Sequence, residues 1–168
     1  MQQLDKSRHE YKNGYYLKKL EEGLQFQDVV TQALYQRGIV VVGYSSRRFQ
    51  NSHGENMLGA EIKRDGNFRD TGNLYIEVAE KSHPDNPAYI DSGIMRADNS
   101  WLFVIGDELD IWIFSTKYLR KLKGRYKHVE TPTSRAFLMP LSEADNYAIR
   151  KISLEPTQLH SRDPDVPF

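Results

Sequence analysis

The chain has 168 residues, a formal net charge of zero and no cysteine. With 39% hydrophobic and 27% charged residues it resembles an ordinary soluble protein, and we expect one domain over residues 1–168. The lack of cysteine excludes a disulfide framework and a thiolate metal site, and it favours a cytoplasmic location. No apolar run is long enough for a membrane span, and zero net charge argues against indiscriminate nucleic-acid binding.

A helix followed by a buried strand is predicted near the start of the chain. Residues 1–19 are polar and rich in tyrosine, and we expect them to form an arm or a short helix. From Gly23 onward, apolar residues recur with the period of one helix face, and Gly38 is suited to end that helix. The apolar run at 39–42 then predicts a buried strand.

The stretch Gly59–Lys81 predicts two short strands joined by a polar turn, since apolar and polar residues alternate with period two on both sides of the turn. Antiparallel pairing around Arg69 would place Glu61 opposite Glu77, with Cβ atoms about 5 Å apart. Two facing carboxylates destabilise a strand pair unless a cation lies between them.

Two explanations of this acidic pair remain open. A divalent cation such as Mg²⁺ takes carboxylate oxygens, and with Lys63 or Lys81 nearby the group could attack a phosphodiester. Alternatively, the residues form the exposed polar face of a hairpin on which the lysines neutralise the glutamates.

The second half of the chain predicts more strands and two helices. Trp101–Gly106 and Asp110–Phe114 are apolar and rich in β-formers, so we expect a pair of strands with both tryptophans in or near the core. Ser115 or Thr116 would cap a helix through TKYLRKL. The remaining expectations are a last strand at AFLMPL, a terminal helix capped by Ser142 and a loose tail over 156–168.

Basic residues gather in two places that could contact phosphates. Arg47 and Arg48 follow the first predicted strand in a polar loop. A second group lies between residues 117 and 127 with tyrosines among the cations, a composition suited to nucleic-acid backbones or to a solvated helix face. Its members are Lys117, Arg120, Lys121, Lys123, Arg125 and Lys127.

The predicted order of elements resembles the core of the PD-(D/E)xK nuclease superfamily over roughly residues 23–122. That resemblance implies an α/β protein with a restriction endonuclease-like αβββαβ core, in which a mixed central sheet is flanked by helices. AEIKRD resembles the family's second strand and YIEVAEK its third strand, which carries an acid and a lysine. Gln27 stands where many members have a glutamate in the opening helix.

The resemblance implies a Mg²⁺-dependent DNA endonuclease, with Mn²⁺ as an alternative metal and a homodimer for duplex cleavage. Glu61 and Glu77 would hold the metal, with Asp65 or Glu55 as further or alternative ligands. The catalytic lysine would be Lys81, four residues after Glu77. A literal acid-x-lysine also occurs as Glu61-Ile62-Lys63, which offers Lys63 instead, with Glu55 as the second acid.

Two other classes of function stay open. The same fold could serve as a non-catalytic module that binds nucleic acid, or the N-terminal tyrosines could bind another protein. The sequence contains no Walker A loop, no GxGxxG after a strand, no HExxH and no GxSxG. The corresponding nucleotide, zinc and serine-hydrolase chemistries are therefore not predicted.

Overall fold

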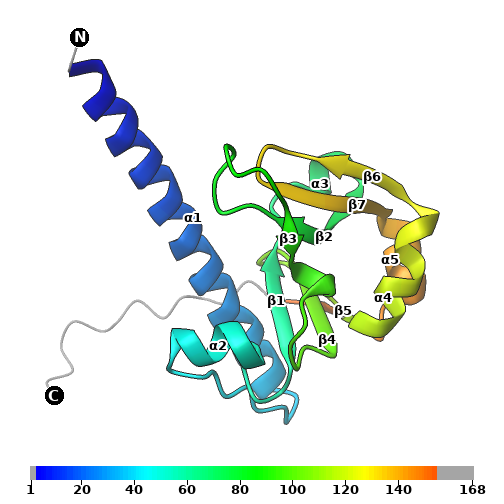
Figure 1. The fold of residues 1–168 in the computed structure, drawn as a ribbon. Coiled ribbons are helices and arrows are strands. Elements are labelled where there is room, and N and C mark those ends of the chain that lie inside the picture. The colour runs from blue at the N-terminus through cyan, green and yellow to red at the C-terminus, as the bar shows by residue number, and fades with distance from the viewer. Residues whose placement is uncertain (1–2, 155–168) are drawn as a thin grey trace, which may run out of the picture.

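The computed structural model describes residues 3–154, without the side chains of 3–13, 15, 16 and 47. It shows a mixed α/β protein with one mixed and one antiparallel four-stranded sheet, flanked by helices (Figure 1). The predicted loose tail at 156–168 lies outside the described residues. In chain order the elements are α1 (Gln3–Tyr35), α2 (Arg47–His53), β1 (Ala60–Arg64), α3 (Phe68–Thr71), β2 (Asn73–Glu80), β3 (Ile90–Asp91), η1 (Gly93–Met95), β4 (Leu102–Gly106), β5 (Asp110–Ser115), α4 (Thr116–Leu122), η2 (Lys123–Arg125), β6 (Lys127–Glu130), β7 (Ser134–Pro140), α5 (Leu141–Tyr147) and β8 (Arg150–Ser153).

Helix α1 contains the predicted first helix and extends it toward the N-terminus, so most of the region predicted as an arm is helical. Its N-terminal part projects beyond the rest of the protein (Figure 1). The predicted apolar face is confirmed, because Phe26, Val30 and Leu34 are buried. Gly38 follows the helix with a φ of 79° and donates its N–H to the carbonyl of Tyr35, as a helix-ending glycine does.

The first sheet has the strand order β1-β4-β5-β8, with β1 parallel to β4 and the other pairs antiparallel. The predicted pairing of the two apolar strands is confirmed as β4 with β5. Ser115 caps the predicted helix α4 by accepting the N–H of Tyr118. Trp112 is buried as expected, whereas Trp101 is 57% exposed and packs its ring edge near Gly59.

The second sheet is antiparallel, with the order β3-β2-β7-β6. Strand β7 corresponds to the predicted strand at AFLMPL. Helix α5 follows it at the predicted place, but its N-terminal cap is Pro140 rather than Ser142. Strands β6 and β8 were not predicted.

The predicted hairpin over Gly59–Lys81 is wrong. Strand β1 pairs with β4, 38 or more residues further along, and β2 pairs with β3 and β7, so the two strands belong to different sheets. Asp65 and α3 separate them. One carboxylate oxygen of Asp65 accepts the N–H of Asn67 and the other accepts that of Tyr75, which fixes the path of the chain between the sheets.

The predicted buried strand at 39–42 is also wrong. This segment has no regular secondary structure, and Val40 is 62% exposed. Only Val41 packs against the core, and the nearest ladder contact is a single bridge between Gly43 and Asn56. An apolar run becomes a buried strand only where a neighbouring strand pairs with it, and neither of the two sheets includes residues 39–42.

Two apolar cores lie on opposite faces of the first sheet. One face packs against α1 through Ile62, Val104 and Ile111. The other face contributes Phe103 and Ile105 to a larger core that also contains residues of the second sheet and of helices α3, α4 and α5. The first sheet is thus the middle layer between α1 and the second sheet. Within the described residues, no helix is both long enough and apolar enough to cross a membrane.

Candidate functional site

The candidate site begins on β1, at the edge of the first sheet. Ala60 and Ile62 face α1, so the alternating residues Glu61 and Lys63 face the second sheet. In the parallel register Glu61 lies beside Phe103, which belongs to the larger apolar core. The apolar core between the two sheets therefore ends at β1, where Glu61 and Lys63 take the place of apolar side chains.

Glu61 and Lys63 form an ion pair in which the acid is buried and the lysine is partly exposed. The Nζ of Lys63 lies 3.0 Å from Oε1 of Glu61, whose side chain is only 1% exposed. Neither oxygen of this carboxylate accepts a conventional hydrogen bond within the described part of the chain. A buried carboxylate is costly unless it is paired, so the ammonium group of Lys63 accounts for its charge and leaves acceptor capacity unused.

Glu77 projects toward the same place from β2 of the second sheet, and two hydroxyl groups hold it. Its Oε1 accepts a hydrogen bond from Ser92 at 2.8 Å, and its Oε2 accepts one from Ser134 at 3.0 Å. Ser134 in turn accepts a hydrogen bond from the hydroxyl of Tyr75 at 3.0 Å. We call Tyr75, Ser134, Glu77 and Ser92 the hydroxyl chain. Each carboxylate oxygen of Glu77 keeps lone pairs for a further ligand.

The turn at η1 brings Ser92 to Glu77. A Cβ atom at Gly93 would lie 2.4 Å from the carbonyl oxygen of Glu77, and its φ is +49°, so this close approach needs glycine. Arg120 of α4 fixes the same turn, donating from Nε to the carbonyl of Ile94 and from Nη2 to that of Arg96. Neither Ser92 nor Ser134 was predicted, since they lie 15 and 57 residues from Glu77 in the chain.

Glu55 completes the acidic group and lies just before β1. Burial raises the pKa of its carboxyl group, and the charge of Glu61 raises that pKa further. For Lys63, burial lowers the pKa, but the negative charges of Glu61 and Glu77 outweigh burial and raise it above the ordinary value. Lys63 is therefore a stable cation that interacts with three carboxyl groups from different parts of the chain.

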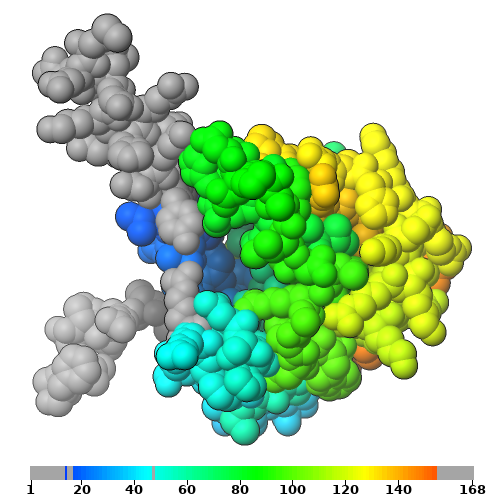
Figure 2. Space-filling model, in the orientation of Figure 1, coloured from blue at the N-terminus to red at the C-terminus, as the bar shows by residue number. Residues whose placement is uncertain are grey.

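A cleft of about 830 Å³ opens in front of this group. It is lined by α1, β1, β2 and the turn between β6 and β7, and its floor includes Glu55, Lys63 and Glu77. We call it the acid–lysine cleft. Figure 2 shows the surface hollowed between α1, in blue, and the green segment that follows β2. A volume of this size is typical of sites for small molecules or for part of a polymer.

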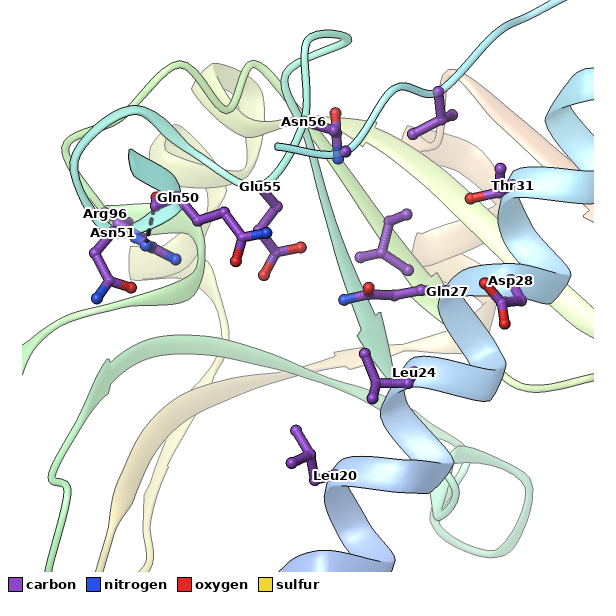
Figure 3. A pocket seen from close by; sticks show the side chains of 13 residues that line it. Leu20, Leu24, Gln27, Asp28, Thr31, Gln50, Asn51, Glu55, Asn56 and Arg96 are labelled. Carbon is purple, nitrogen blue, oxygen red and sulfur yellow. Dashed lines mark hydrogen bonds between the residues drawn. The ribbon is translucent and has the colours of Figure 1, made fainter. Parts of the chain in front are cut away.

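A second hollow of about 630 Å³ adjoins the cleft. The two share Leu20, Leu24, Gln27, Glu55 and Ile62. Figure 3 shows Gln27 from α1 and Gln50 from α2 pointing toward each other across this space, with Glu55 beside Gln50. We call it the amide hollow.

Two further predicted site residues lie apart from the group. Asp65 lines the cleft, but both of its oxygens already accept backbone N–H groups. Lys81 was predicted as the catalytic lysine, four residues after Glu77. An irregularity in β2 between Glu77 and Ala79 shifts the alternation, and the Nζ of Lys81 lies 4.3 Å from the ring centroid of Tyr89. Lys63, not Lys81, is the lysine beside the acids.

The basic residues predicted to bind nucleic acid have different surroundings. Arg48 is exposed on α2, which begins at Arg47. Arg120 supports the η1 turn, and Arg125 donates a hydrogen bond to the hydroxyl of Tyr147 at 3.1 Å. Lys123 lies near the sulfur of Met95. Lys117, Lys121 and Lys127 are also exposed and lie on α4 and β6, at the end of the protein opposite α1 (Figure 1).

Glu61, Glu55 and Glu77 are the residues that would hold a divalent cation. Among residues 3–154, no three acidic or histidine side chains stand as a ready-made metal site. Apart from the ion pair with Lys63, Glu61 and Glu55 nevertheless have buried carboxylate oxygens without a hydrogen-bond partner among the described residues, and carboxylates are the preferred ligands of Mg²⁺. The ammonium group of Lys63 balances these charges in the structure as it stands.

Comparison of the chain with protein-family models, with curated proteins and with solved structures gives no match.

Proposed function

We propose that this protein is a divalent-metal-dependent DNA endonuclease. The observation that carries the proposal is the buried Glu61 paired with Lys63 two residues later, with Glu55 and Glu77 close enough to act on the same ammonium group. This arrangement supports Glu61-Ile62-Lys63 as the acid-x-lysine strand of a restriction endonuclease-like αβββαβ core, with Glu55 as the other acid. Such an enzyme would be cytoplasmic and would act as a homodimer on duplex DNA.

The roles of the residues follow from their chemistry. Glu61 and Glu77, with Glu55 as a further ligand, would hold Mg²⁺ or Mn²⁺, which neutralises charge on the phosphate and lowers the pKa of bound water. Lys63 would orient the attacking water and stabilise the negative charge that develops on the phosphate. The hydroxyl chain would keep the carboxylate of Glu77 aimed at the cation. Arg48, Lys117, Lys121 and Lys127 would contact flanking phosphates.

A second candidate is a non-catalytic nucleic-acid-binding module. It is favoured by the lack of a ready-made group of three ligands among the described residues and by the neutralisation of Glu61 by Lys63. Under this alternative the acids and the lysine serve stability alone, and divalent cations do not bind in a saturable way.

Cleavage of a mixed DNA panel separates the two candidates. Plasmid, linear duplex, branched and single-stranded DNA are incubated with Mg²⁺, Mn²⁺ or EDTA, using the wild-type protein and its Glu77→Gln variant. Glu80→Gln is a matched control, because Glu80 is an exposed acid on the same strand. Metal-dependent products that disappear only in Glu77→Gln support the nuclease. A salt-sensitive mobility shift without products supports the binding module.

A further inference from the structure

The amide hollow has a composition that suits an uncharged, flat and polar-edged ligand. Its charged lining residues are Asp28, Glu55 and Arg96. The guanidinium of Arg96 is already engaged, with Nε 3.1 Å from Oδ2 of Asp98 and Nη2 donating to the carbonyl of Gln50. No uncommitted cation therefore faces this space from the described part of the chain. A phosphate or another anion would be repelled, whereas a neutral group would not.

The hollow offers both apolar walls and hydrogen-bonding edges. Leu20 and Leu24 of α1 are 39% and 53% exposed, and Ile62 and Val41 complete the apolar lining. The side-chain amide of Gln27 makes no hydrogen bond with any described residue and points into the hollow in Figure 3. Apolar faces that enclose amide groups are the usual surroundings of a nucleobase, which stacks on its faces and hydrogen-bonds along its edge.

The position of the hollow relates it to the proposed nuclease. The acid–lysine cleft and the amide hollow meet at Gln27 and Glu55. In a nucleotide, only the sugar separates the phosphate from the base. A phosphate bound in the cleft beside Lys63 would have its base one sugar away, and the hollow is the space that adjoins the cleft.

We propose that the amide hollow binds an unpaired nucleobase of the DNA strand whose phosphate lies at Glu61 and Lys63. This inference rests on the proposed nuclease function and adds its substrate class. A base inside the hollow cannot at the same time be paired within a duplex, so the preferred substrate contains single-stranded, branched or locally opened DNA. Gln27 reads the edge of the base together with the side-chain oxygen of Gln50, whose amide nitrogen already donates to the carbonyl of Tyr44. The leucines of α1 cover the face of the base.

The test uses free deoxynucleosides as probes and requires neither metal nor cleavage. The ¹⁵N-labelled full chain is titrated in EDTA with each of the four deoxynucleosides, and the side-chain amide signals of Gln27, Gln50 and Asn51 are followed by NMR. Saturable shifts of the Gln27 and Gln50 signals are expected with at least one nucleoside. Deoxyribose 5-phosphate, which has no base, should produce none.

Variants on α1 assign the binding to the hollow. Gln27→Leu keeps the side-chain size and removes the amide, and it should weaken nucleoside binding roughly two- to tenfold, as the loss of one neutral hydrogen bond does. Gln25→Leu, at an exposed position on the same helix, should leave binding unchanged. Binding is followed in both variants by the Gln50 signal.

The inference is overturned if no nucleoside shifts the Gln27 and Gln50 signals in a saturable way, or if the two variants bind equally well. Metal-dependent cleavage without nucleoside binding would reject the base site and leave the nuclease standing. Nucleoside binding without any DNA cleavage would support the base site and reject the nuclease function.

Discussion

Ser134 of β7 lies with its Oγ 3.0 Å from Oε2 of Glu77 of β2, and it accepts a hydrogen bond from Tyr75 in turn. With Ser92 on the other oxygen, the carboxylate of Glu77 is held from both sides. A hydroxyl that both accepts and donates has a fixed orientation, so the hydroxyl chain fixes the direction of the carboxylate as well as its position. This geometry is what a metal ligand needs from the groups around it.

Replacing Ser134 by alanine should weaken metal binding. Loss of a hydrogen bond that orients a ligand typically costs about 10- to 100-fold in metal affinity. Titration with Mn²⁺, followed by electron paramagnetic resonance of the free ion, measures the affinity directly and without cleavage. Ser134→Thr keeps the hydroxyl and should restore binding, and Ser142→Ala, at an exposed serine, should have no effect. Equal affinity of the wild-type and Ser134→Ala proteins would contradict a positioning role.

Lys63 and Glu61 should show strong coupling in a double-mutant cycle. Lys63→Met leaves the carboxylate of Glu61 buried without its partner and should destabilise the protein by about 2 kcal/mol or more. Adding Glu61→Gln removes the unpaired buried charge. The free energy of unfolding of the double variant should therefore exceed the value expected from adding the two single effects by about 1 kcal/mol or more. Urea unfolding in EDTA gives the four free energies. Additive effects would mean that the ion pair is energetically unimportant.

Glu55 should make stability depend on pH. Burial raises the pKa of its carboxyl group in the folded protein, so the folded state binds a proton more tightly than the unfolded state. The stabilising contribution of Glu55 is fully present below about pH 4. It is lost as the pH rises through the raised pKa of Glu55 in the folded protein. Glu55→Gln should therefore be more stable than the wild type at neutral pH, with a difference that shrinks on acidification. Urea unfolding in EDTA at a series of pH values checks this, and a difference that grows on acidification would refute it.

Arg120 should matter for stability, unlike its neighbour Lys121. Arg120→Met removes the two hydrogen bonds to the η1 turn and should cost about 1–2 kcal/mol in the free energy of unfolding. Lys121→Met, at an exposed position on the same helix, should change it by less than about 0.5 kcal/mol. Urea unfolding of both variants makes the comparison. Similar stability of the two variants would mean that the hydrogen bonds of Arg120 to the η1 turn do not stabilise the protein.

Local sequence patterns predicted the elements whose partners are near in the chain. The apolar face of α1 and the β4–β5 pair were predicted because periodicity and short connections are visible in a few residues. The prediction of the hairpin was wrong because both of its strands have partners that are distant in the sequence. The parallel pairing of β1 with β4 has no short turn between the strands that a sequence pattern could indicate. The prediction of a strand at 39–42 was wrong because hydrophobicity alone does not supply a neighbouring strand.

The candidate site was predicted in part and for an incorrect reason. Glu61 and Glu77 do act on a common neighbour, Lys63, but they reach it from two sheets rather than across a hairpin. The alternative that offered Glu55 and Lys63 describes the arrangement better than the one with Lys81. The hydroxyl groups of Ser92 and Ser134 could not be predicted, since isolated serines have no pattern that relates them to an acid on another strand.

The proposed nuclease activity is tested by the rate of DNA cleavage under single-turnover conditions for the wild-type, Glu61→Gln and Glu80→Gln proteins. The variants are compared at equal folded concentration, with Mg²⁺, Mn²⁺ or EDTA. We expect metal-dependent cleavage by the wild-type and Glu80→Gln proteins and a loss of about 100-fold or more in Glu61→Gln, as for removal of a catalytic charge-stabilising group. Undiminished cleavage by a folded Glu61→Gln protein would contradict the proposed nuclease function.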